Sequence, residues 1–428
     1  MATFRIEGGR PLAGEVIPSG NKNAALPLLA ACLLTDQPVT LHNVPEIGDV
    51  QAMRHLLEGL GVTVEAAAPH HWQVRAHQVR RADLDPEVCR LIRASILLAG
   101  PMLARSGDIK LPPPGGDVIG RRRVDTHFLA LRALGAEVDY GGREFHLRAP
   151  HGLRGADILL DEASVTATEN AVMAAVRARG DSVIRNAASE PHVQELCHFL
   201  NRLGARIENV GSNTLHIQGV DSLGSTEHTV GPDYLEVVSF IGAAAITGGA
   251  VRIRRAGVEH LAMVRLVLGR FGVRWEEEGE DVVVPAGQQL EIVPDLGGAV
   301  PQISVMPWPA FPTDLMSIAI VIATQARGTV LFHDWMYPSR MFFIDKLVSM
   351  GARIILCDPH RGLVLGPTRL LGETLDSPDI RAGMALVLAA LAAEGESQIR
   401  NIGQIERGYE QIDEKLRALG ARIQRIEA

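Results

Sequence analysis

The chain has few aromatic residues, few cysteines and no long apolar run. Phe, Trp and Tyr make up 4% of its 428 residues, which argues against the base-stacking surfaces of proteins that bind single-stranded nucleic acid. The four cysteines, Cys32, Cys89, Cys197 and Cys357, include no CxxC pair. We therefore expect neither a disulfide framework nor a zinc site, and a reducing cytoplasmic location. Apolar stretches such as Met384–Ala393 are far shorter than the roughly 18–20 residues that span a membrane.

An excess of one charge and several familiar catalytic motifs are also lacking. Lys and Arg number 42 and Asp and Glu 50, for a net charge of -8, which excludes an acidic tail and a protein that coats DNA. The opening MATFRIEGG has no apolar core of a secretory signal. The motifs GxxxxGK[ST], HExxH and GxSxG are absent, so P-loop nucleotide hydrolysis, zinc proteolysis and α/β-hydrolase chemistry have no support. The histidines show no metal-ligand spacing, and we expect no metal.

One short phrase recurs six times along the chain: an apolar residue, Gly, a small residue, any residue, then an apolar residue. Each copy follows a helical pattern, as in VQAMRHLLEGLG (50–61), and precedes an alternation typical of a strand. The glycine falls where a helix C-cap favours a left-handed residue. These glycines, 68 to 79 residues apart, are Gly61, Gly135, Gly204, Gly272, Gly351 and Gly420.

The repeat predicts an α/β fold built from six units of about 70 residues. Ala-rich helices in AAVRARGDSVIRNA (174–187), GAAAITGGAVRIRRA (242–256) and LAALAAEGESQIRNI (388–402) are typical of close core packing. Because solenoids usually repeat every 20–45 residues or so, we expect two three-repeat domains with a cleft between them rather than a solenoid. We place the boundary near GPDY (231–234).

Candidate anion-binding residues stand out in the first half. Lys22 lies at a helix start in SGNKNAALPLLAACLL (19–34), where free amides and the helix dipole favour an anion. PPPGG (112–116) is a candidate loop that ends at Asp117, and three consecutive arginines follow at 121–123. Such a run fits a phosphate or carboxylate partner. A solvated lysine and a solvated surface run are the alternatives.

The second half carries charged residues at expected loop-to-helix junctions, where site residues are common. Asp314 lies in FPTDL, Arg340 in YPSR and Arg407 in ERGYE, and Asp379 with Arg381 lies in SPDIRAG. Taken singly, Asp314 also fits a helix cap and the other residues fit surface charges.

Taken together, these segments resemble the enolpyruvyl transferases over essentially the whole chain. The resemblance is carried by SGNKNAALPLLAA, IRASILLAGPMLAR, LPPPGGDVIGRRRVDTH, ATENAVMAAV, NAASEPHVQEL, PAFPTDL, PDIRAGMALVLAALAAEG and IERGYEQIDEKLRALGA. It implies two inside-out α/β domains, each three-fold repeated. One would cover 22–231 and carry a lid loop at about 112–123, and the other would cover 1–21 and 232–428. The active site would lie in the cleft between them.

The resemblance also implies a reaction. Members of the family move the enolpyruvyl group of phosphoenolpyruvate to a hydroxyl through a tetrahedral ketal and release phosphate. The segments match most closely the branch whose acceptor is the 3'-hydroxyl of UDP-N-acetylglucosamine, in peptidoglycan synthesis. No cofactor is implied, and the oligomeric state is left open. A different nucleotide or sugar-phosphate acceptor, and a non-catalytic ligand-binding paralogue, are the alternatives.

Roles for single residues follow from the same resemblance. Asp117 would protonate the methylene carbon, Asp314 would take the acceptor's hydroxyl proton, and Lys22 and Arg407 would face the phosphate. The implied substrate contacts are Asn23, Arg93, Arg122, Asp125, Ser164, Val165, Glu190, Met336, Arg340, Asp379 and Arg381.

Several positions depart from the family pattern. Asp117 stands where most members have Cys, and because a carboxylate is a poor nucleophile toward an epoxide, we expect insensitivity to fosfomycin. Arg123 replaces a usual Pro, and Glu162 and Thr166 replace a usual Lys and Gly. Tyr234 also departs from the pattern. The changes after Asp117 cluster on the nucleotide-sugar side, which keeps the alternative acceptors open.

Overall fold

The computed structural model describes residues 2–80 and 84–427, which form two compact units. Unit 1 comprises Met1–Ser19, Val118–Arg121 and Pro232–Ala428, and unit 2 comprises Gly20–Asp117 and Arg122–Gly231. The expected lid loop is thus divided after Asp117, and its residues Val118–Arg121 belong to unit 1. In the described ranges, no helix has the length and apolarity needed to cross a membrane.

Unit 2 holds three sheets, in the strand orders β13-β3-β5-β4, β6-β8-β7 and β11-β12-β10-β9. Its helices are α1 (Lys22–Ala31), η1 (Cys32–Leu34), α2 (Gly48–Gly59), α3 (Pro86–Leu91), η2 (Arg93–Leu98), α4 (Ala99–Ser106), α5 (Asp125–Ala133), α6 (Val165–Ala175) and α7 (Pro191–Arg202). Its strands are β3 (Val39–His42), β4 (Thr63–Ala68), β5 (His71–Arg75), β6 (Asp108–Leu111), β7 (Glu137–Tyr140), β8 (Phe145–Arg148), β9 (Asp157–Leu159), β10 (Asp181–Arg185), β11 (Arg206–Glu208), β12 (Thr214–Gln218) and β13 (Thr226–Thr229).

Unit 1 also holds three sheets, ordered β15-β16-β14-β2, β17-β18-β20-β19 and β21-β22-β1-β23. Its helices are α8 (Tyr234–Thr247), η3 (Val258–His260), α9 (Ala262–Gly269), η4 (Leu296–Gly298), η5 (Thr313–Leu315), α10 (Met316–Gln325), η6 (Arg340–Phe343), α11 (Ile344–Ser349), α12 (Ile380–Ala392), α13 (Gly403–Glu406) and α14 (Ile412–Ala418). Its strands are β1 (Thr3–Glu7), β2 (Ala13–Val16), β14 (Ala250–Ile253), β15 (Glu276–Glu278), β16 (Asp281–Val284), β17 (Gln302–Ser304), β18 (Gly328–His333), β19 (Arg353–Asp358), β20 (Arg361–Gly366), β21 (Thr374–Asp376), β22 (Glu396–Arg400) and β23 (Arg422–Ile426).

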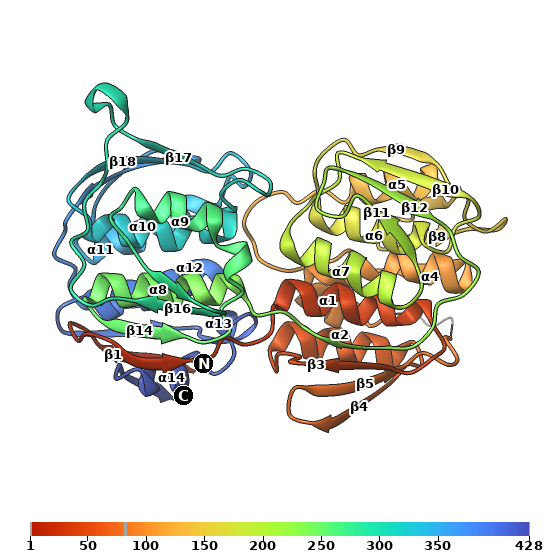
Figure 1. The fold of residues 1–428 in the computed structure, drawn as a ribbon, viewed down its shortest axis with the longest axis horizontal. Helices are drawn as coiled ribbons and strands as arrows, with labels where there is room; N and C mark the ends of the chain where they lie inside the picture. The colour runs from red at the N-terminus through yellow and green to blue at the C-terminus, as the bar shows by residue number, and fades with distance from the viewer. Residues whose placement is uncertain (1, 81–83, 428) are drawn as a thin grey trace. The chain divides into compact units, whose positions relative to one another are not determined.

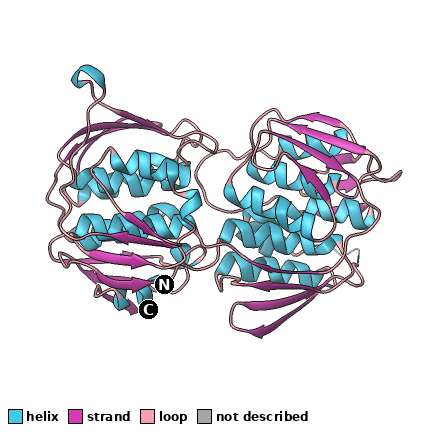
Figure 2. Cartoon of the chain, in the orientation of Figure 1, coloured by secondary structure: helices cyan, strands magenta, loops and turns pink. Residues whose placement is uncertain are grey.

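Each unit is built inside out, with helices in the interior and strands around them (Figures 1 and 2). In unit 1, α8, α10 and α12 pack against one another, and α12 is buried from Ile380 to Leu391. Small residues make this approach possible. A Cβ atom on Gly242 of α8 would lie 3.1 Å from the Ile322 side chain and 3.2 Å from the Leu388 side chain. The Ala-rich helices therefore pack in the core, as the sequence predicts.

The six repeat glycines all adopt the left-handed backbone that their C-cap position predicts. Their φ angles lie between 82° and 108°, a region that is costly for residues with a Cβ. Each ends a helix and leads into a strand, namely β4, β7, β11, β15, β19 or β23. The predicted helix–glycine–strand unit is therefore confirmed in all six copies.

The two N-terminal strands complete sheets of unit 1. β1 lies between β22 and β23 and is antiparallel to both, with Thr3 opposite Arg400 and Ile426. β2 pairs in parallel with β14. At the other boundary, β13 returns to pair in parallel with β3 and completes a sheet of unit 2. Strand pairing thus explains why residues 1–19 belong with the second half of the chain.

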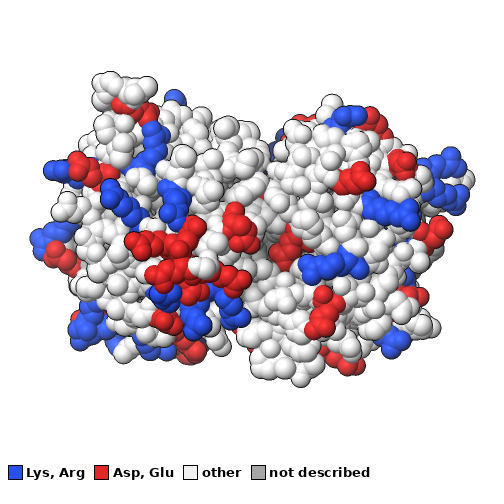
Figure 3. All heavy atoms as spheres, in the orientation of Figure 1, with Lys and Arg blue, Asp and Glu red and all other residues white. Residues whose placement is uncertain are grey.

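On the face of unit 1 that Figure 3 shows, acidic side chains form a contiguous group with basic side chains around it. Acidic and basic side chains lie next to one another on the face shown in Figure 3. Ion pairs such as Arg252–Glu278 and Arg265–Glu277 join neighbouring elements at the surface of unit 1. Exposed pairs of this kind contribute little to stability.

Candidate functional site

Lys22 occupies a buried position at the start of α1. The side chain of Asn21 caps this helix by accepting from the N–H groups of Asn23 and Ala24. Lys22 Nζ lies 3.2 Å from Asp49 Oδ2, and the side chains are only 11% and 6% exposed. A solvated lysine was the alternative, and the structure excludes it. The Asp49 partner, in the first turn of α2, has no motif that would reveal it in the sequence.

The stretch before Asp117 packs against α3 and η2 of unit 2. Gly115 N donates to Cys89 O at 3.1 Å, and a Cβ on Gly115 would lie 1.7 Å from Arg90 O. Only glycine fits there. Arg93 Nη2 donates to the carbonyls of Arg122 and Arg123, at 3.2 and 2.6 Å. Arg93 therefore fixes the backbone of the arginine segment.

The third arginine of the run is surrounded by carboxylates. Arg123 forms ion pairs with Asp161 at 2.6 Å, Asp125 at 3.5 Å and Glu162 at 3.8 Å. Hydrogen bonding and attraction to Asp161 raise the pKa of Arg123. Two of the departures from the family pattern, Arg123 and Glu162, thus face each other. Arg123 is exposed at the surface, with a side chain that is 39% accessible, so the surface-run interpretation still applies to it, with these carboxylates as its partners.

The N-terminus of α6 is anchored by buried polar contacts. Ser164 caps it by accepting from Ala167 N at 3.4 Å, and Val165 is its first residue. His127 Nε2 lies 3.0 Å from Thr166 Oγ1, and His127 Nδ1 lies 2.9 Å from Asn170 Nδ2. Burial lowers the pKa of His127 to about 3. This neutral histidine joins α5, which begins at Asp125, to α6.

Glu190 precedes α7 and faces a second acid. Its side chain makes no capping hydrogen bond to that helix. Burial and the nearby charge of Glu190 raise the pKa of Glu169, on α6, well above its usual range. Glu169 is 1% exposed, and this burial favours its protonated form because an uncompensated buried carboxylate is costly.

In unit 1, Asp314 sits between two buried arginines. Arg340 Nη2 donates to Asp314 Oδ1 at 2.7 Å, and Arg381 Nε lies 3.4 Å from Asp314 Oδ2. The arginine side chains are 3% exposed, whereas Asp314 is 30% exposed. Its carboxylate caps neither η5 nor α10, so the cap interpretation of Asp314 is wrong. Asp379 is the residue that caps a helix, since its Oδ1 accepts from Arg381 N and Ala382 N at the start of α12.

The two buried arginines have guanidinium donors that remain unsatisfied within the part of the chain that the structure describes. Among the described residues, Nη1 and Nη2 of Arg381 and Nε and Nη1 of Arg340 are buried and have no hydrogen-bond partner. Arg340 Nη1 lies 3.9 Å from Asp379 Oδ1. Leaving buried donors unsatisfied is costly. A small carboxylate or phosphate would satisfy them, because guanidinium groups match both anions.

Arg407 and Met336 complete the candidate residues of unit 1. Arg407 Nη1 donates to Gln404 Oε1 at 3.0 Å, just after α13. Met336 N donates to Asp334 Oδ1 at 3.0 Å. Asp334 and Thr313 hold this region. Thr313 lies in the FPTDL motif beside Asp314, whereas Asp334 belongs to none of the recognised motifs, so the sequence gives no signal for their contact.

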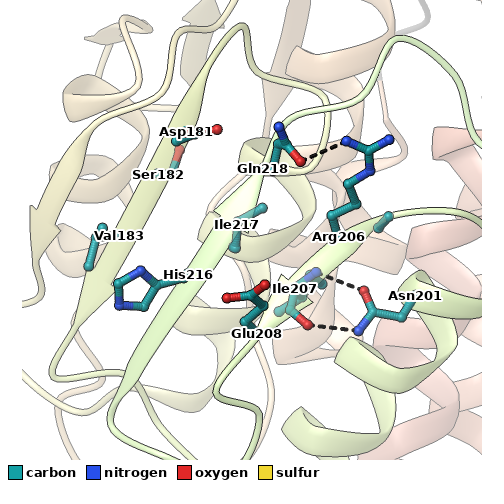
Figure 4. Close-up of a pocket in the computed structure, with 11 residues that line it drawn as sticks. Asp181, Ser182, Val183, Asn201, Arg206, Ile207, Glu208, His216, Ile217 and Gln218 are labelled. Carbon is teal, nitrogen blue, oxygen red and sulfur yellow. Dashed lines mark hydrogen bonds between the residues drawn. The ribbon is translucent and has the colours of Figure 1, made fainter.

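A separate hollow of about 500 Å³ lies on the β11-β12-β10-β9 sheet (Figure 4). It is lined by Asp181, Ser182, Val183, Asn201, Ala205, Arg206, Ile207, Glu208, His216, Ile217 and Gln218. None of the candidate residues is among them. Within residues 2–80 and 84–427, no group of His, Cys, Asp and Glu side chains could hold a metal ion.

The candidates therefore form two sets, each described within its own unit. Unit 2 carries Lys22, Asn23, Arg93, Asp117, Arg122, Asp125, Ser164, Val165 and Glu190, and unit 1 carries Asp314, Met336, Arg340, Asp379, Arg381 and Arg407. Direct contacts join Asp314, Arg340 and Arg381. In unit 2, Arg93 contacts the Arg122–Arg123 backbone.

A comparison with known families gives a full-length match. The model of the EPSP synthase (3-phosphoshikimate 1-carboxyvinyltransferase) family matches residues 6–416. The chain belongs to this family. The enolpyruvyl transferase NikO from Streptomyces tendae has a similar structure, with a TM-score of 0.88, 25% identity, and coverage of 100% of this chain and 99% of that chain. EPSP synthase from Acinetobacter baumannii, at 17% identity and a TM-score of 0.77, shares the fold. The expected enolpyruvyl transferase fold is confirmed.

Much closer family members carry a more specific name. A protein of Bradyrhizobium diazoefficiens named UDP-N-acetylglucosamine 1-carboxyvinyltransferase is 57% identical over 423 residues, 99% of this chain and 98% of its own. Relatives with the same name from Treponema denticola and Borreliella burgdorferi are 53% and 49% identical over 99% and 100% of both chains. The resemblance stated from the sequence motifs is thus confirmed.

Proposed function

We propose that this chain transfers the enolpyruvyl group of phosphoenolpyruvate to the 3'-hydroxyl of UDP-N-acetylglucosamine and releases phosphate, as a step in peptidoglycan synthesis. The names of its full-length relatives at 49–57% identity support this acceptor. The observation that carries the proposal is the buried pair Arg340 and Arg381. Both contact the Asp314 carboxylate, and both have further buried donors that no hydrogen-bond partner satisfies in the described part of the chain. Such a pair suits an anionic substrate beside a proton acceptor.

The roles follow from charge and position. Asp314 would take the proton of the acceptor hydroxyl while the oxygen bonds to C2 of phosphoenolpyruvate and Asp117 protonates the methylene carbon. In the second step the C2–O bond to phosphate breaks, the new methyl group returns a proton to the Asp117 carboxylate, and the departing phosphate takes the proton that Asp314 had accepted. Arg340 and Arg381 would hold one anionic group of phosphoenolpyruvate, and Lys22, Arg122 and Arg407 would supply further positive charge. This reaction needs both sets of residues.

A different acceptor is the second candidate. Arg123 is engaged by Asp125, Asp161 and Glu162, so three carboxylates stand near the proposed nucleotide side, beside the N-terminus of α6. Anionic groups repel a diphosphate. The observation therefore favours testing nucleotides and sugar phosphates other than UDP-N-acetylglucosamine.

The test is phosphate release from phosphoenolpyruvate with a panel of acceptors. We expect turnover with UDP-N-acetylglucosamine and none with shikimate 3-phosphate. Turnover with another nucleotide alone would support the second candidate. No release with any acceptor would contradict both and indicate a non-catalytic ligand-binding protein.

A further inference from the structure

A fully buried carboxylate, Asp334, joins the two segments of unit 1 that carry Asp314 and Arg340. Asp334 follows β18 directly and is 0% exposed. From its contacts we infer that Asp334 is a positioning residue that, through Thr313, sets the place of Asp314 relative to the 336–340 segment. The inference rests on the proposed function, because that function assigns a proton-acceptor role to Asp314 and a substrate contact to Met336.

Each oxygen of the Asp334 carboxylate serves a different segment. Oδ2 accepts from Thr313 Oγ1 at 2.5 Å, and Thr313 immediately precedes Asp314. Oδ1 accepts from Met336 N at 3.0 Å and Tyr337 N at 3.2 Å. The Asp334 side chain thus contacts both the residue before Asp314, the proposed proton acceptor, and the backbone of the segment that leads to Arg340.

The contacts close into a ring. Arg340, three residues beyond Tyr337, donates through Nη2 to Asp314 Oδ1 at 2.7 Å, and its Cζ lies 5.5 Å from the Tyr337 ring centroid. The path from Asp334 through Thr313 to Asp314 therefore meets the path through Tyr337 to Arg340. A shift at Asp334 would move both partners of the Asp314–Arg340 pair.

Asp334 is itself held in place by the sheet that contains β18. Asp334 N donates to His360 O at 2.8 Å, and His360 Nδ1 lies 2.7 Å from Asp334 O. His360 lies between β19 and β20, which pair next to β18. Elements of regular structure hold functional groups more accurately than loops do.

The chemistry of the Asp334 carboxylate also favours a role beyond capping the turn that follows it. Burial raises the pKa of Asp334, while the Thr313 hydrogen bond and the charge of Arg340 lower it. A buried carboxylate is costly, and a turn needs only one acceptor oxygen, which a neutral Asn supplies. The second acceptor oxygen of the Asp334 carboxylate is the one that accepts from the Thr313 hydroxyl.

Thr313→Val tests the link without touching the turn, because it removes only the hydroxyl that bonds to Asp334. We expect kcat to fall about 10- to 100-fold, as misplaced catalytic groups commonly cause, with the KM for phosphoenolpyruvate within about twofold. Thr313→Ser, which restores a hydroxyl, should recover most of kcat. Thr368→Val is the matched control, since Thr368 Oγ1 donates to Thr324 O at 3.1 Å away from these residues; it should lose stability but not kcat.

Asp334→Asn provides a second readout. Its oxygen can still accept from the Met336 and Tyr337 amides, so we expect a melting temperature close to that of the wild type. Its NH2 group can meet Thr313 Oγ1 only as a donor, and because a neutral hydrogen bond is weaker than one to a carboxylate, we expect a reduced kcat. Wild-type kcat in both Thr313→Val and Asp334→Asn would overturn the inference while leaving the proposed function intact. Failure of the wild-type protein to release phosphate with any acceptor would instead overturn the proposed function, and the inference with it.

Discussion

At the scale of single residues, burial distinguishes the arginines of the proposed site from arginines at the surface. Arg381 is 3% exposed, with Tyr409 beneath it at 5.3 Å, whereas Arg327 is 73% exposed and pairs with Glu291. Desolvation strengthens every interaction of the buried guanidinium. An electrostatic interaction of Arg381 is therefore stronger than a similar interaction of Arg327.

Arg381→Lys should separate charge from geometry. Lysine keeps the positive charge but loses the second nitrogen of the fork, so we expect kcat/KM for phosphoenolpyruvate to fall about 100-fold, or about 2.7 kcal/mol. Steady-state phosphate release measures this. Arg327→Lys is the control and should match the wild type. Equal rates for the two variants would remove Arg381 from the proposed site.

Asp117→Cys should create sensitivity to fosfomycin. The thiolate is a strong nucleophile toward an epoxide and a carboxylate is a weak one. Burial raises the pKa of Cys32 and Cys197 to about 12 and that of Cys89 to about 11, so these thiols are unreactive. Cys357 is exposed and should first be replaced by Ala.

In that background, we expect the unmodified lid residue to give an active enzyme that fosfomycin does not inactivate. Asp117→Cys should retain activity and show time-dependent loss of it, with the adduct visible by mass spectrometry. Rapid inactivation of the protein that still carries Asp117 would show that the lid residue has been misplaced.

At the scale of elements, α6 carries two of the proposed substrate contacts at its N-terminus and is buried along most of its length. Its N-terminus presents Ser164 and Val165, while Glu169 one turn later is buried beside the charge of Glu190. Asn170 ties the same helix to α4 and η2, since its Oδ1 accepts from Gly100 N and its Nδ2 donates to Ile96 O. The helix is thereby fixed by polar contacts that a purely apolar helix would lack.

Glu169 should make the free energy of unfolding depend on pH. Its pKa is raised in the folded protein, above the ordinary value of 4.5, so the folded state keeps a proton that the unfolded state releases. The contribution of Glu169 is therefore fully present below pH 4.5 or so and is lost as pH rises through the folded pKa. Glu169→Gln, which mimics the protonated acid, should remove that loss.

Urea unfolding at pH 5 and pH 8 measures the effect. The Gln variant should gain stability relative to the wild type at the higher pH. Glu162→Gln, on a side chain that is 43% exposed, is the control and should leave the pH dependence nearly unchanged. Parallel pH profiles for the wild type and Glu169→Gln would contradict the prediction.

At the scale of the whole molecule, unit 1 depends on residues from the far end of the chain. β1 is an inner strand between β22 and β23, and β2 extends the sheet of β14. Removing β1 would expose the hydrogen-bonding edges of two strands, and exposed edges invite aggregation. The segment from residue 232 onward is therefore incomplete by itself.

A fragment of unit 1 that carries β1 and β2 at its C-terminal end should fold, whereas the same fragment without these strands should not. Because Thr3 lies opposite Ile426, a short flexible linker can join the C-terminal end to residue 2. We expect 232–427, followed by the linker and 2–19, to give a cooperative thermal transition. The fragment 232–427 without β1 and β2 should not, and circular dichroism would compare them. Cooperative melting of both fragments would show that these strands are dispensable.

Much of the fold could be predicted because the repeat is local. A glycine that ends a helix, followed by alternating apolar residues, is a pattern within about a dozen residues, and its physical cause, the left-handed C-cap, acts within one turn. The structure confirms it at all six glycines. The charged segments were recognised in the same way, through contiguous motifs such as LPPPGGDVIGRRRVDTH and PDIRAG.

The sequence by itself determined the α/β repeat, the membership of an enolpyruvyl transferase family and the candidate charged residues, because each is written in a contiguous stretch. Only the tertiary structure decided which charges are buried and what they face. Asp314 meets Arg340 and Arg381 from 26 and 67 positions away, Lys22 meets Asp49, and Thr313 meets Asp334. Desolvation and directional hydrogen bonds set these energies, and both depend on what the folded chain packs around a side chain rather than on its neighbours in sequence.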